Sequence, residues 1–204
     1  MPADFGTVED RSFVISNFRL QNGAVMPQAK IVYETDGRLA ADRRNAVLIG
    51  HGHTSSHHAV GRNSANGNLP GWWDGLIGSG KVIDTDRLSA ASSNIARFVL
   101  WLEQRREHRP ANRQALQTRF PAITMRGIVA AERALLGALG VKHLVAVAGP
   151  SYCGCQAFQW AVDYPEFMDC VVPVVTAPRR RMSSRARPSS RLAQFLEPLM
   201  AKLG

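Results

Sequence analysis

The order of apolar and polar positions along the chain predicts β-strands that alternate with helices. Residues 13–20 and 28–35 alternate apolar and polar side chains, as half-buried strands do. Gln21, Asn22 and Gly23 lie between them and form a turn signal, so these two segments are expected to pair as an antiparallel hairpin. Further along, short apolar runs predict buried strands at residues 46–50, 88–93, 144–148 and 171–175.

Residues 124–139 carry apolar side chains at helical spacing, and Gly140 follows as a stop signal. A second helical pattern begins after residue 151 and ends near Tyr164 and Pro165. Strands that alternate with helices are typical of a doubly wound, mostly parallel sheet. The predicted fold class is therefore α/β, with an antiparallel hairpin at the N-terminal side.

The segment Leu144–Trp160 predicts a strand, a tight turn that carries Ser151, and a helix. This order is that of a nucleophile elbow, in which the residues two before and two after the Ser are small. Gly149 fits that need, whereas Cys153 stands where a Gly is expected and Gly154 comes one position later. We expect the Cys153 side chain to strain the turn. The alternative is an ordinary strand-to-helix turn with an incidental Ser.

A loop rich in Gly and His, residues 51–58, follows the apolar run 46–50. Open α/β sheets bind their ligands at the carboxyl ends of central strands, and in α/β-hydrolases a loop at this place supplies one amide of the oxyanion hole. The loop holds His51, His53, His57 and His58. No carboxylate or Cys lies near them in sequence, so no metal site is predicted, and each His is expected to be an exposed polar residue.

Trp72 and Trp73 form a pair in a loop, and two roles remain open for them. Paired indole rings bury a large area and can form the wall of a pocket. They can equally fill a gap beneath the sheet.

The net charge of +9 over 204 residues is concentrated in two segments. Residues 97–119 hold six Arg and two Glu, and residues 178–204 hold six Arg, one Lys and one Glu. The rest of the chain is close to neutral, and neither basic segment carries a known nucleic-acid motif, so no nucleic-acid partner is expected.

Three cysteines, Cys153, Cys155 and Cys170, show no metal-binding spacing and are expected to be free thiols in a reducing compartment. No apolar run approaches the length of about 18 residues that a membrane span needs. The first ten residues lack the basic start and apolar core of a signal peptide. A cytoplasmic protein without a membrane partner is therefore expected.

Three segments carry a family resemblance: GWWDGLIGSGKVIDTDR (71–87), FPAIT (120–124) and AVAGPSYCGCQAFQWAVDYPEFMD (146–169). They resemble the homoserine O-acetyltransferase branch of the α/β-hydrolase fold, and the resemblance covers residues 13–96 and 120–177. It implies transfer of an acyl group from an acyl-CoA, such as acetyl-CoA, to the hydroxyl of homoserine or a similar amino acid. The route passes through an acyl-Ser intermediate in methionine biosynthesis, with no bound cofactor and with a homodimer as the assembly.

The resemblance also assigns site residues. Ser151 is the nucleophile, and the backbone N–H groups of Tyr152 and His53 form the oxyanion hole. The family places its triad Asp and His later than position 204, and in this sequence no His follows Ser151; the last is His143. The chain is therefore expected to be inactive as written, because a Ser without its base is a weak nucleophile.

The expected organisation is an incomplete α/β-hydrolase core over residues 1–177, with a mobile tail or the start of a lid over 178–204. Residues 97–119 do not match the family. A choice of synonymous codons permits a family-like Gly/Ser-rich loop when this segment is read one base out of frame, so a frame error is favoured over a real basic insertion. Two other functions stay open: a general serine esterase and a non-catalytic remnant. An unpaired last strand would make the chain poorly soluble.

Overall fold

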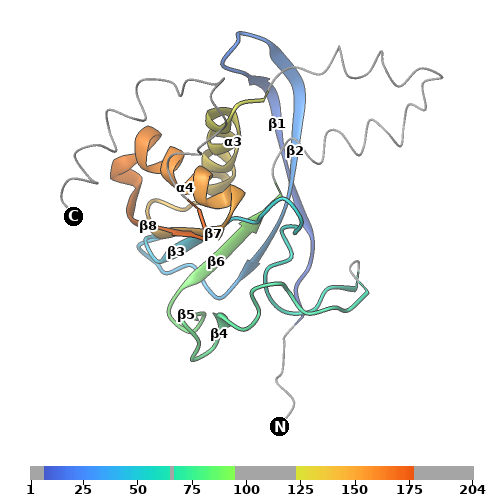
Figure 1. Cartoon of the computed structure of the whole chain (residues 1–204), viewed down its shortest axis with the longest axis vertical. Coiled ribbons are helices and arrows are strands. Elements are labelled where there is room, and N and C mark those ends of the chain that lie inside the picture. The colour runs from blue at the N-terminus through green and yellow to red at the C-terminus, as the bar shows by residue number, and fades with distance from the viewer. Residues whose placement is uncertain (1–6, 65–66, 95–122, 177–204) are drawn as a thin grey trace.

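The computed structural model describes residues 7–64, 67–94 and 123–176, and these form a six-stranded sheet with two helices packed on one face (Figure 1). The strand order is β1-β2-β6-β3-β7-β8, with a separate two-stranded ribbon of β4 and β5. The strands are β1 (Arg11–Arg19), β2 (Val25–Asp36), β3 (Ala46–Ile49), β4 (Ile77–Gly78), β5 (Ile83–Asp84), β6 (Ser89–Ser93), β7 (Leu144–Pro150) and β8 (Met168–Val174). The helices are α3 (Met125–Ala138), α4 (Tyr152–Asp163) and a 3₁₀ turn, η2 (Pro165–Phe167).

The pairing follows the predicted pattern. β1 and β2 form the antiparallel hairpin, and β2 is also antiparallel to β6. β6, β3, β7 and β8 are parallel to one another. The mostly parallel α/β sheet with an N-terminal hairpin is therefore confirmed. The basic segments 97–119 and 178–204 lie outside the described residues, so the frame error, the tail and the domain boundaries stay predictions.

Helix α3 begins and ends where the sequence signals predict. The Thr124 hydroxyl accepts a hydrogen bond of 3.2 Å from the N–H of Gly127, which caps the first turn. Gly140 follows the helix with φ +78°, a conformation that favours glycine. The apolar face of α3, with Ile128 and Leu135 both buried, packs toward the sheet.

The two faces of the sheet have different covers. Leu48 of β3 packs into the cluster that also holds Leu136 of α3 and Trp160 of α4. Val47 and Ile49 point to the other face, where Ala59, Val60 and Ile77 pack against them. Within the described residues, α3 and α4 thus cover one face of the sheet, and loops and short strands of the crossover from β3 to β6 cover the other.

The two tryptophans pack under the sheet. Trp72 and Trp73 contact the apolar cluster of the loop-covered face. The indole N–H of Trp72 donates to the carbonyl oxygen of Ser56 at 2.8 Å. This location agrees with the gap-filling role.

Strand β8 is less buried than predicted. Asp169 and Cys170 are exposed, and Val172 is 44% exposed. The prediction of a buried strand at 171–175 was wrong because, among the described residues, β8 pairs with β7 on one side and has no strand on the other. None of the described helices combines the length and apolar character that crossing a membrane requires.

Candidate active site

Ser151 occupies the sharp turn between β7 and α4 that the elbow pattern predicts. Its φ of +53° with ψ of −110° is a strained conformation for a residue with a Cβ. The Ser151 N–H donates to the carbonyl oxygen of Val174 at 2.9 Å, which ties the turn to the end of β8. The Ser151 side chain is exposed and makes no capping bond to the helix. The hydroxyl is thus presented outward at the N-terminus of α4, where the helix dipole favours negative charge.

Cys153 fits beneath the turn because two glycines leave room for it. A Cβ added at Gly50 would lie 1.9 Å from the Cys153 sulfur, and one at Gly149 would lie 2.4 Å from it. The Cys153 side chain is 1% exposed, and its sulfur lies 3.7 Å from the carbonyl oxygen of Ala148. Burial raises the pKa of the Cys153 thiol well above its usual value. The larger residue at the second position after Ser151 is therefore accommodated by the space that Gly149 and Gly50, the residue after β3, leave beneath the turn.

Gly154 has its own reason to lack a side chain. A Cβ at this position would lie 2.0 Å from Cγ2 of Thr176, just after β8. The small residue that the elbow pattern expects at 153 thus lies one position later. Gly154 leaves room for Thr176 just after β8. Gly50 and Gly149 leave room for the Cys153 side chain beside β3.

The 51–58 loop reaches the candidate nucleophile. A Cβ at Gly52 would lie 3.8 Å from the Ser151 Cβ, so the loop backbone lies against the Ser. The rings of His53 and Tyr152 have centroids 4.5 Å apart. The fold therefore brings the two residues predicted to form the oxyanion hole together beside Ser151. The N–H of Gly52 is already bonded to the hydroxyl oxygen of Ser55, at 3.1 Å.

Three of the four loop histidines are buried, which corrects the expectation that each is exposed. His51, His57 and His58 are 3%, 7% and 5% exposed. Burial lowers the pKa of His51, whose Nδ1 contacts the carbonyl oxygen of Gly52 at 2.7 Å. The expectation failed because each ring finds a polar partner inside the protein, and a buried polar group with a partner is tolerated.

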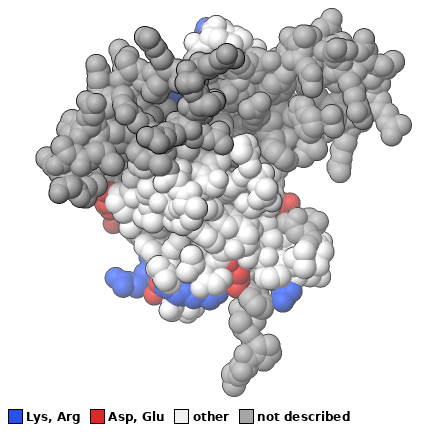
Figure 2. All heavy atoms as spheres, in the orientation of Figure 1, with Lys and Arg blue, Asp and Glu red and all other residues white. Residues whose placement is uncertain are grey.

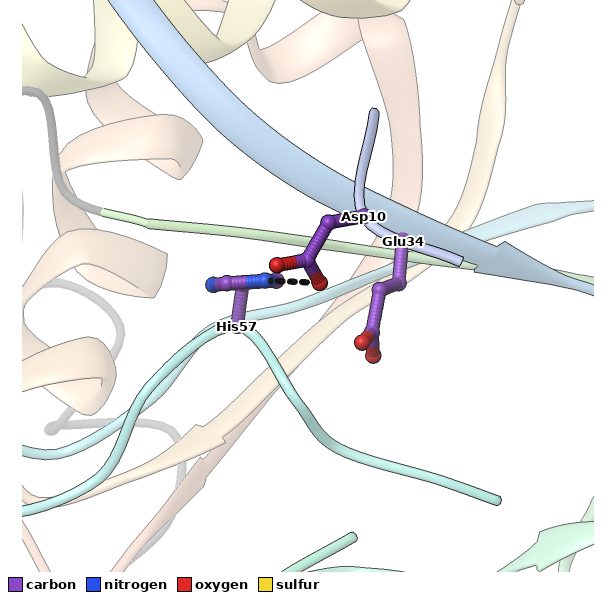
Figure 3. A group of neighbouring side chains, drawn as sticks. All are labelled: Asp10, Glu34 and His57. Carbon is purple, nitrogen blue, oxygen red and sulfur yellow. Dashed lines mark hydrogen bonds and ion pairs between the residues drawn. The ribbon is translucent and has the colours of Figure 1, made fainter. Parts of the chain in front are cut away.

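The partners of His57 and His58 form a polar group on the loop-covered face of the sheet, which is buried except at Asp10 and part of which Figure 3 shows. We call this group the His–carboxylate network; its members are Asp10, Glu34, His57, His58 and Asn63. His57 Nε2 lies 2.8 Å from Asp10, and His58 Nδ1 lies 3.0 and 3.1 Å from the two carboxyl oxygens of Glu34. The Asn63 amide donates to both acids, at 2.6 Å to Asp10 and 2.8 Å to Glu34.

Burial acts on the two acids of this network with different results. Burial raises the pKa of Glu34, and the hydrogen bonds from Asn63 and His58 only partly offset it. Burial also opposes ionisation of Asp10, but contacts with His57 and Asn63 outweigh it, so the pKa of Asp10 is lowered. Asp10 therefore carries the negative charge more readily than Glu34.

Asp10, Glu34 and His57 place one potential metal-ligand atom each within 4.8 Å of one another. No local sequence pattern indicates this group, because Asp10 lies 47 residues from His57 along the chain and Glu34 lies 24 residues from His58. Each of these three side chains already has a hydrogen-bond partner inside the network. The absence of a metal site stays a prediction.

The remaining titratable candidates lie away from Ser151. His143 precedes β7 and pairs with Asp169 of β8 at 2.7 Å. Ser151 follows β7, so the seven-residue strand separates the two by about 20 Å. Asp163 is bound to Arg126 at 2.9 Å and to Gln159. None of these three residues is placed to act as a base for Ser151.

The visible face of the molecule in Figure 2 mixes charges. Across the described part of that face the surface is largely uncharged, with basic and acidic side chains next to each other along the lower rim.

Comparison with known proteins gives consistent relatives. The homoserine O-acetyltransferase of Pelobacter propionicus is 35% identical over 173 residues, which are 84% of this chain and 47% of that protein. The homoserine O-succinyltransferase of Alkalilimnicola ehrlichii is 39% identical over 181 residues, which are 88% of this chain and 47% of that protein. The chain spans about half the length of the curated relatives it matches. No family model matches the chain.

Solved structures agree on the fold. The homoserine O-acetyltransferase from Bacillus anthracis superposes with a TM-score of 0.72 at 29% identity, covering 87% of this chain and 49% of that one. Esterase E22 superposes with a TM-score of 0.70 at 32% identity, covering 84% of this chain and 48% of that one. The chain therefore has the architecture of the α/β-hydrolase fold. Over most of its own length it is homologous to a stretch that makes up about half of each homoserine O-acyltransferase it matches.

Proposed function

We propose that this chain carries the nucleophile half of a homoserine O-acyltransferase active site. The observation that supports it best is the strained, outward-facing Ser151 at the β7–α4 turn, with the 51–58 loop against it. Relatives named homoserine O-acetyltransferase and homoserine O-succinyltransferase match the segments on both sides of this turn. The co-substrate is an acyl-CoA, with acetyl-CoA favoured, and the acceptor is homoserine or a similar amino acid.

The reaction proceeds in two transfers. The Ser151 hydroxyl loses its proton and its oxygen attacks the thioester carbon of the acyl-CoA; the C–S bond breaks, and CoA leaves as the thiol once it has taken a proton. The hydroxyl oxygen of the acceptor then attacks the acyl-Ser carbonyl. The new ester forms, and the Ser151 oxygen regains a proton. Each transfer passes through a tetrahedral oxyanion.

The oxyanion is stabilised by the backbone N–H groups of Tyr152 and His53. Tyr152 is the first residue of α4, so its amide lies at the positive end of the helix dipole. His53 lies next to Tyr152 through the contact of their rings. Loss of one such donor typically costs about two to three powers of ten in rate.

Among the described residues no general base lies beside Ser151. No His follows Ser151 in the 204 residues, and the described Asp163 and Asp169 are paired with Arg126 and His143. We therefore expect the 204 residues alone to show no turnover, since loss of a triad member removes several powers of ten in rate. We also propose that the enzyme is cytoplasmic and homodimeric, as the family resemblance implies.

A serine esterase is the second candidate, favoured by the likeness to esterase E22. It would use the same Ser151 and the same oxyanion donors. The two functions differ in the acceptor, which is water in an esterase and homoserine in the transferase.

The test joins residues 1–176 of this chain to the complementary half of the Pelobacter propionicus enzyme. CoA release from acetyl-CoA with and without homoserine is measured beside hydrolysis of p-nitrophenyl acetate, for the fusion and for the 204-residue chain alone. We expect homoserine-dependent CoA release from the fusion and none from the chain alone. Ser151→Ala should abolish it, while the exposed-serine control Ser79→Ala should retain it.

Two results would contradict the proposal. A folded fusion that hydrolyses the ester but releases no CoA with homoserine would favour the esterase. Activity of the fusion that survives Ser151→Ala would exclude Ser151 as the nucleophile.

A further inference from the structure

The 51–58 loop is attached to the rest of the protein at its His57–His58 end. The N–H of His57 donates to the Asn94 side chain at 3.2 Å, just after β6. The carbonyl oxygen of Ser56 accepts from the Trp72 indole. The side chains of His57 and His58 add the contacts to Asp10 and Glu34 already described. At its other end the loop continues β3, through the N–H of Gly50 to the carbonyl oxygen of Ala148 at 2.9 Å.

Between these two attachments lie Gly52, whose backbone lies against Ser151, and His53, whose ring contacts Tyr152. The local hydrogen bonds of Gly52 are made within the loop itself, from Gly52 to Ser55 and from Ser55 back to Gly52. The position of the His53 amide therefore depends on where the two ends of the loop are held. One end is fixed by the sheet and the other by the His–carboxylate network.

The hydrogen bonds of His58 fix a proton inside this network. Its Nε2 lies 2.9 Å from the carbonyl oxygen of Leu69, which only accepts, so Nε2 carries a hydrogen. Its Nδ1 faces both carboxyl oxygens of Glu34. An unprotonated Nδ1 and a carboxylate oxygen are both acceptors, so a hydrogen bond between them requires one more proton, either on Nδ1 or on Glu34. The His58–Glu34 pair thus holds one proton more than a neutral imidazole beside a carboxylate.

We propose that the His–carboxylate network positions the 51–58 loop so that the His53 amide lies against Ser151. In this proposal the proton shared by His58 and Glu34 maintains the contact that holds the loop in place. This inference rests on the proposed function for its catalytic meaning. Glu34 and Asp10 are positioning residues in it, because they act through His58 and His57.

The first test is hydrogen exchange of the backbone amides, followed by mass spectrometry on the full 204-residue chain without substrate. Glu34→Ala should speed exchange of the peptide that covers residues 50–56 by at least about tenfold, while amides of α3 and β7 keep their protection. Glu34→Gln should keep protection near that of the wild type, because its amide can donate to a neutral His58 Nδ1.

The matched control is Glu132→Ala, which removes an equally buried Glu on the helix-covered face of the sheet. It should lower overall stability without selective loosening of residues 50–56. If Glu34→Ala does not fold, His57→Ala provides the same test with a smaller loss, because its partner Asp10 has a side chain that is 36% exposed. Exchange in the 50–56 peptide that rises no more than elsewhere, in either variant, would overturn the proposal.

The second test uses pH. Glu34 is faced by His58, His57 and Asp10, and raising the pH removes the proton that His58 and Glu34 share. The protection factor of residues 50–56, corrected for intrinsic exchange and taken relative to that of the α3 and β7 amides, should therefore fall as pH rises in the wild type. The reference to α3 and β7 removes the change in overall stability that Glu132 causes. The fall should be smaller in Glu34→Gln, whose amide does not titrate. A level ratio in the wild type would contradict the shared proton.

These outcomes are separable from the proposed function, because exchange is measured on unreacted protein. Selective loosening in a chain whose fusion shows no turnover would retain the anchoring and reject the catalysis. Turnover with uniform exchange in Glu34→Ala would retain the catalysis and reject the positioning.

Discussion

At the scale of single residues, the Cys153 side chain occupies the space beneath Ser151 that a side chain at Gly50 would need. The Gly50 φ is not in the left-handed region, so an alanine there is excluded by contact and not by backbone strain. That contact is with the Cys153 sulfur and Cβ and, less closely, with Gln156. The expected strain from Cys153 is therefore relieved by a residue about a hundred positions earlier, which no local sequence pattern reveals.

This arrangement predicts a coupled pair of substitutions. Gly50→Ala alone should destabilise the chain by about 1–3 kcal/mol, as overpacking does. In the Cys153→Gly background the same change should cost much less, with a coupling of at least about 1 kcal/mol. Urea unfolding of the four proteins of the cycle measures it. Gly149→Ala is the control, because its Cβ would also lie 2.4 Å from the backbone oxygen of Gly50, so Cys153→Gly should not rescue it. If the losses of unfolding free energy from Gly50→Ala and Cys153→Gly simply add, the steric overlap of the two side chains is refuted.

The three thiols differ in burial, and this predicts their reactivity. Cys170 is exposed, Cys155 is half-buried, and Cys153 is buried with a raised pKa. Because the thiolate is the reactive form, a disulfide reagent at pH 8 should modify Cys170 first and Cys153 only on unfolding. Labelling followed by peptide mass spectrometry gives the order. Rapid modification of Cys153 in the folded chain would contradict the packing of the turn.

At the scale of elements, α3 and α4 are joined by a buried polar contact that the sequence did not indicate. The Trp160 indole N–H donates to the Glu132 carboxyl group at 2.8 Å, and both side chains are almost fully buried. Burial raises the pKa of Glu132 to about 7. The helical spacing of α3 places Glu132 on the same face as Ile128 and Leu136, but its partner Trp160 is revealed only by the packing of α4 against α3.

Glu132 predicts a pH dependence of stability. Its pKa is about 7 in the folded chain against an ordinary 4.5, so the folded state holds the proton more tightly between those values. Its contribution to stability is therefore present below about pH 4.5 and is lost as pH rises to about 7, by about 3 kcal/mol. In Glu132→Gln that decline should be missing. The difference in unfolding free energy between the two proteins at pH 5 and pH 8 measures it, and equal slopes would refute the burial of an ionisable group.

At the scale of the whole molecule, the described sheet ends in β8. The Ser151 N–H donates to the Val174 carbonyl oxygen, so the backbone N–H and C=O of Val174 point toward β7. The backbone groups of the neighbouring Pro173 point the other way, toward the free edge. Proline has no N–H to offer a further strand, and proline on an edge opposes pairing between copies. The predicted poor solubility of the chain is thus countered at one position of this edge.

Pro173→Thr should therefore increase self-association. The change restores an outward N–H and a residue type suited to strands, which makes the edge a better template for a second copy. Light scattering over a range of concentrations compares the variant with the wild type. Val172→Thr is the control, because the backbone N–H and C=O of residue 172 point toward β7 and are not at the free edge. Equal association of the wild type and Pro173→Thr would show that this edge does not mediate contact between copies.

The sequence by itself determined the order of strands and helices and the turn that carries Ser151. It also determined the hairpin and the ends of α3. These features depend on periodicity, on capping residues such as Thr124, and on glycine, all of which act over a few neighbouring positions. The resemblance to homoserine O-acetyltransferases likewise depends on contiguous segments, and the comparisons agree with it.

Only the tertiary structure decided which distant residues meet. It buried His57 and His58 against Asp10 and Glu34, placed Gly50 over Cys153, and put Glu132 against Trp160. It also separated the His143–Asp169 pair from Ser151, at the far end of β7. The physical reason is that such contacts depend on strand order and on the packing of the two faces of the sheet, which a local pattern does not encode.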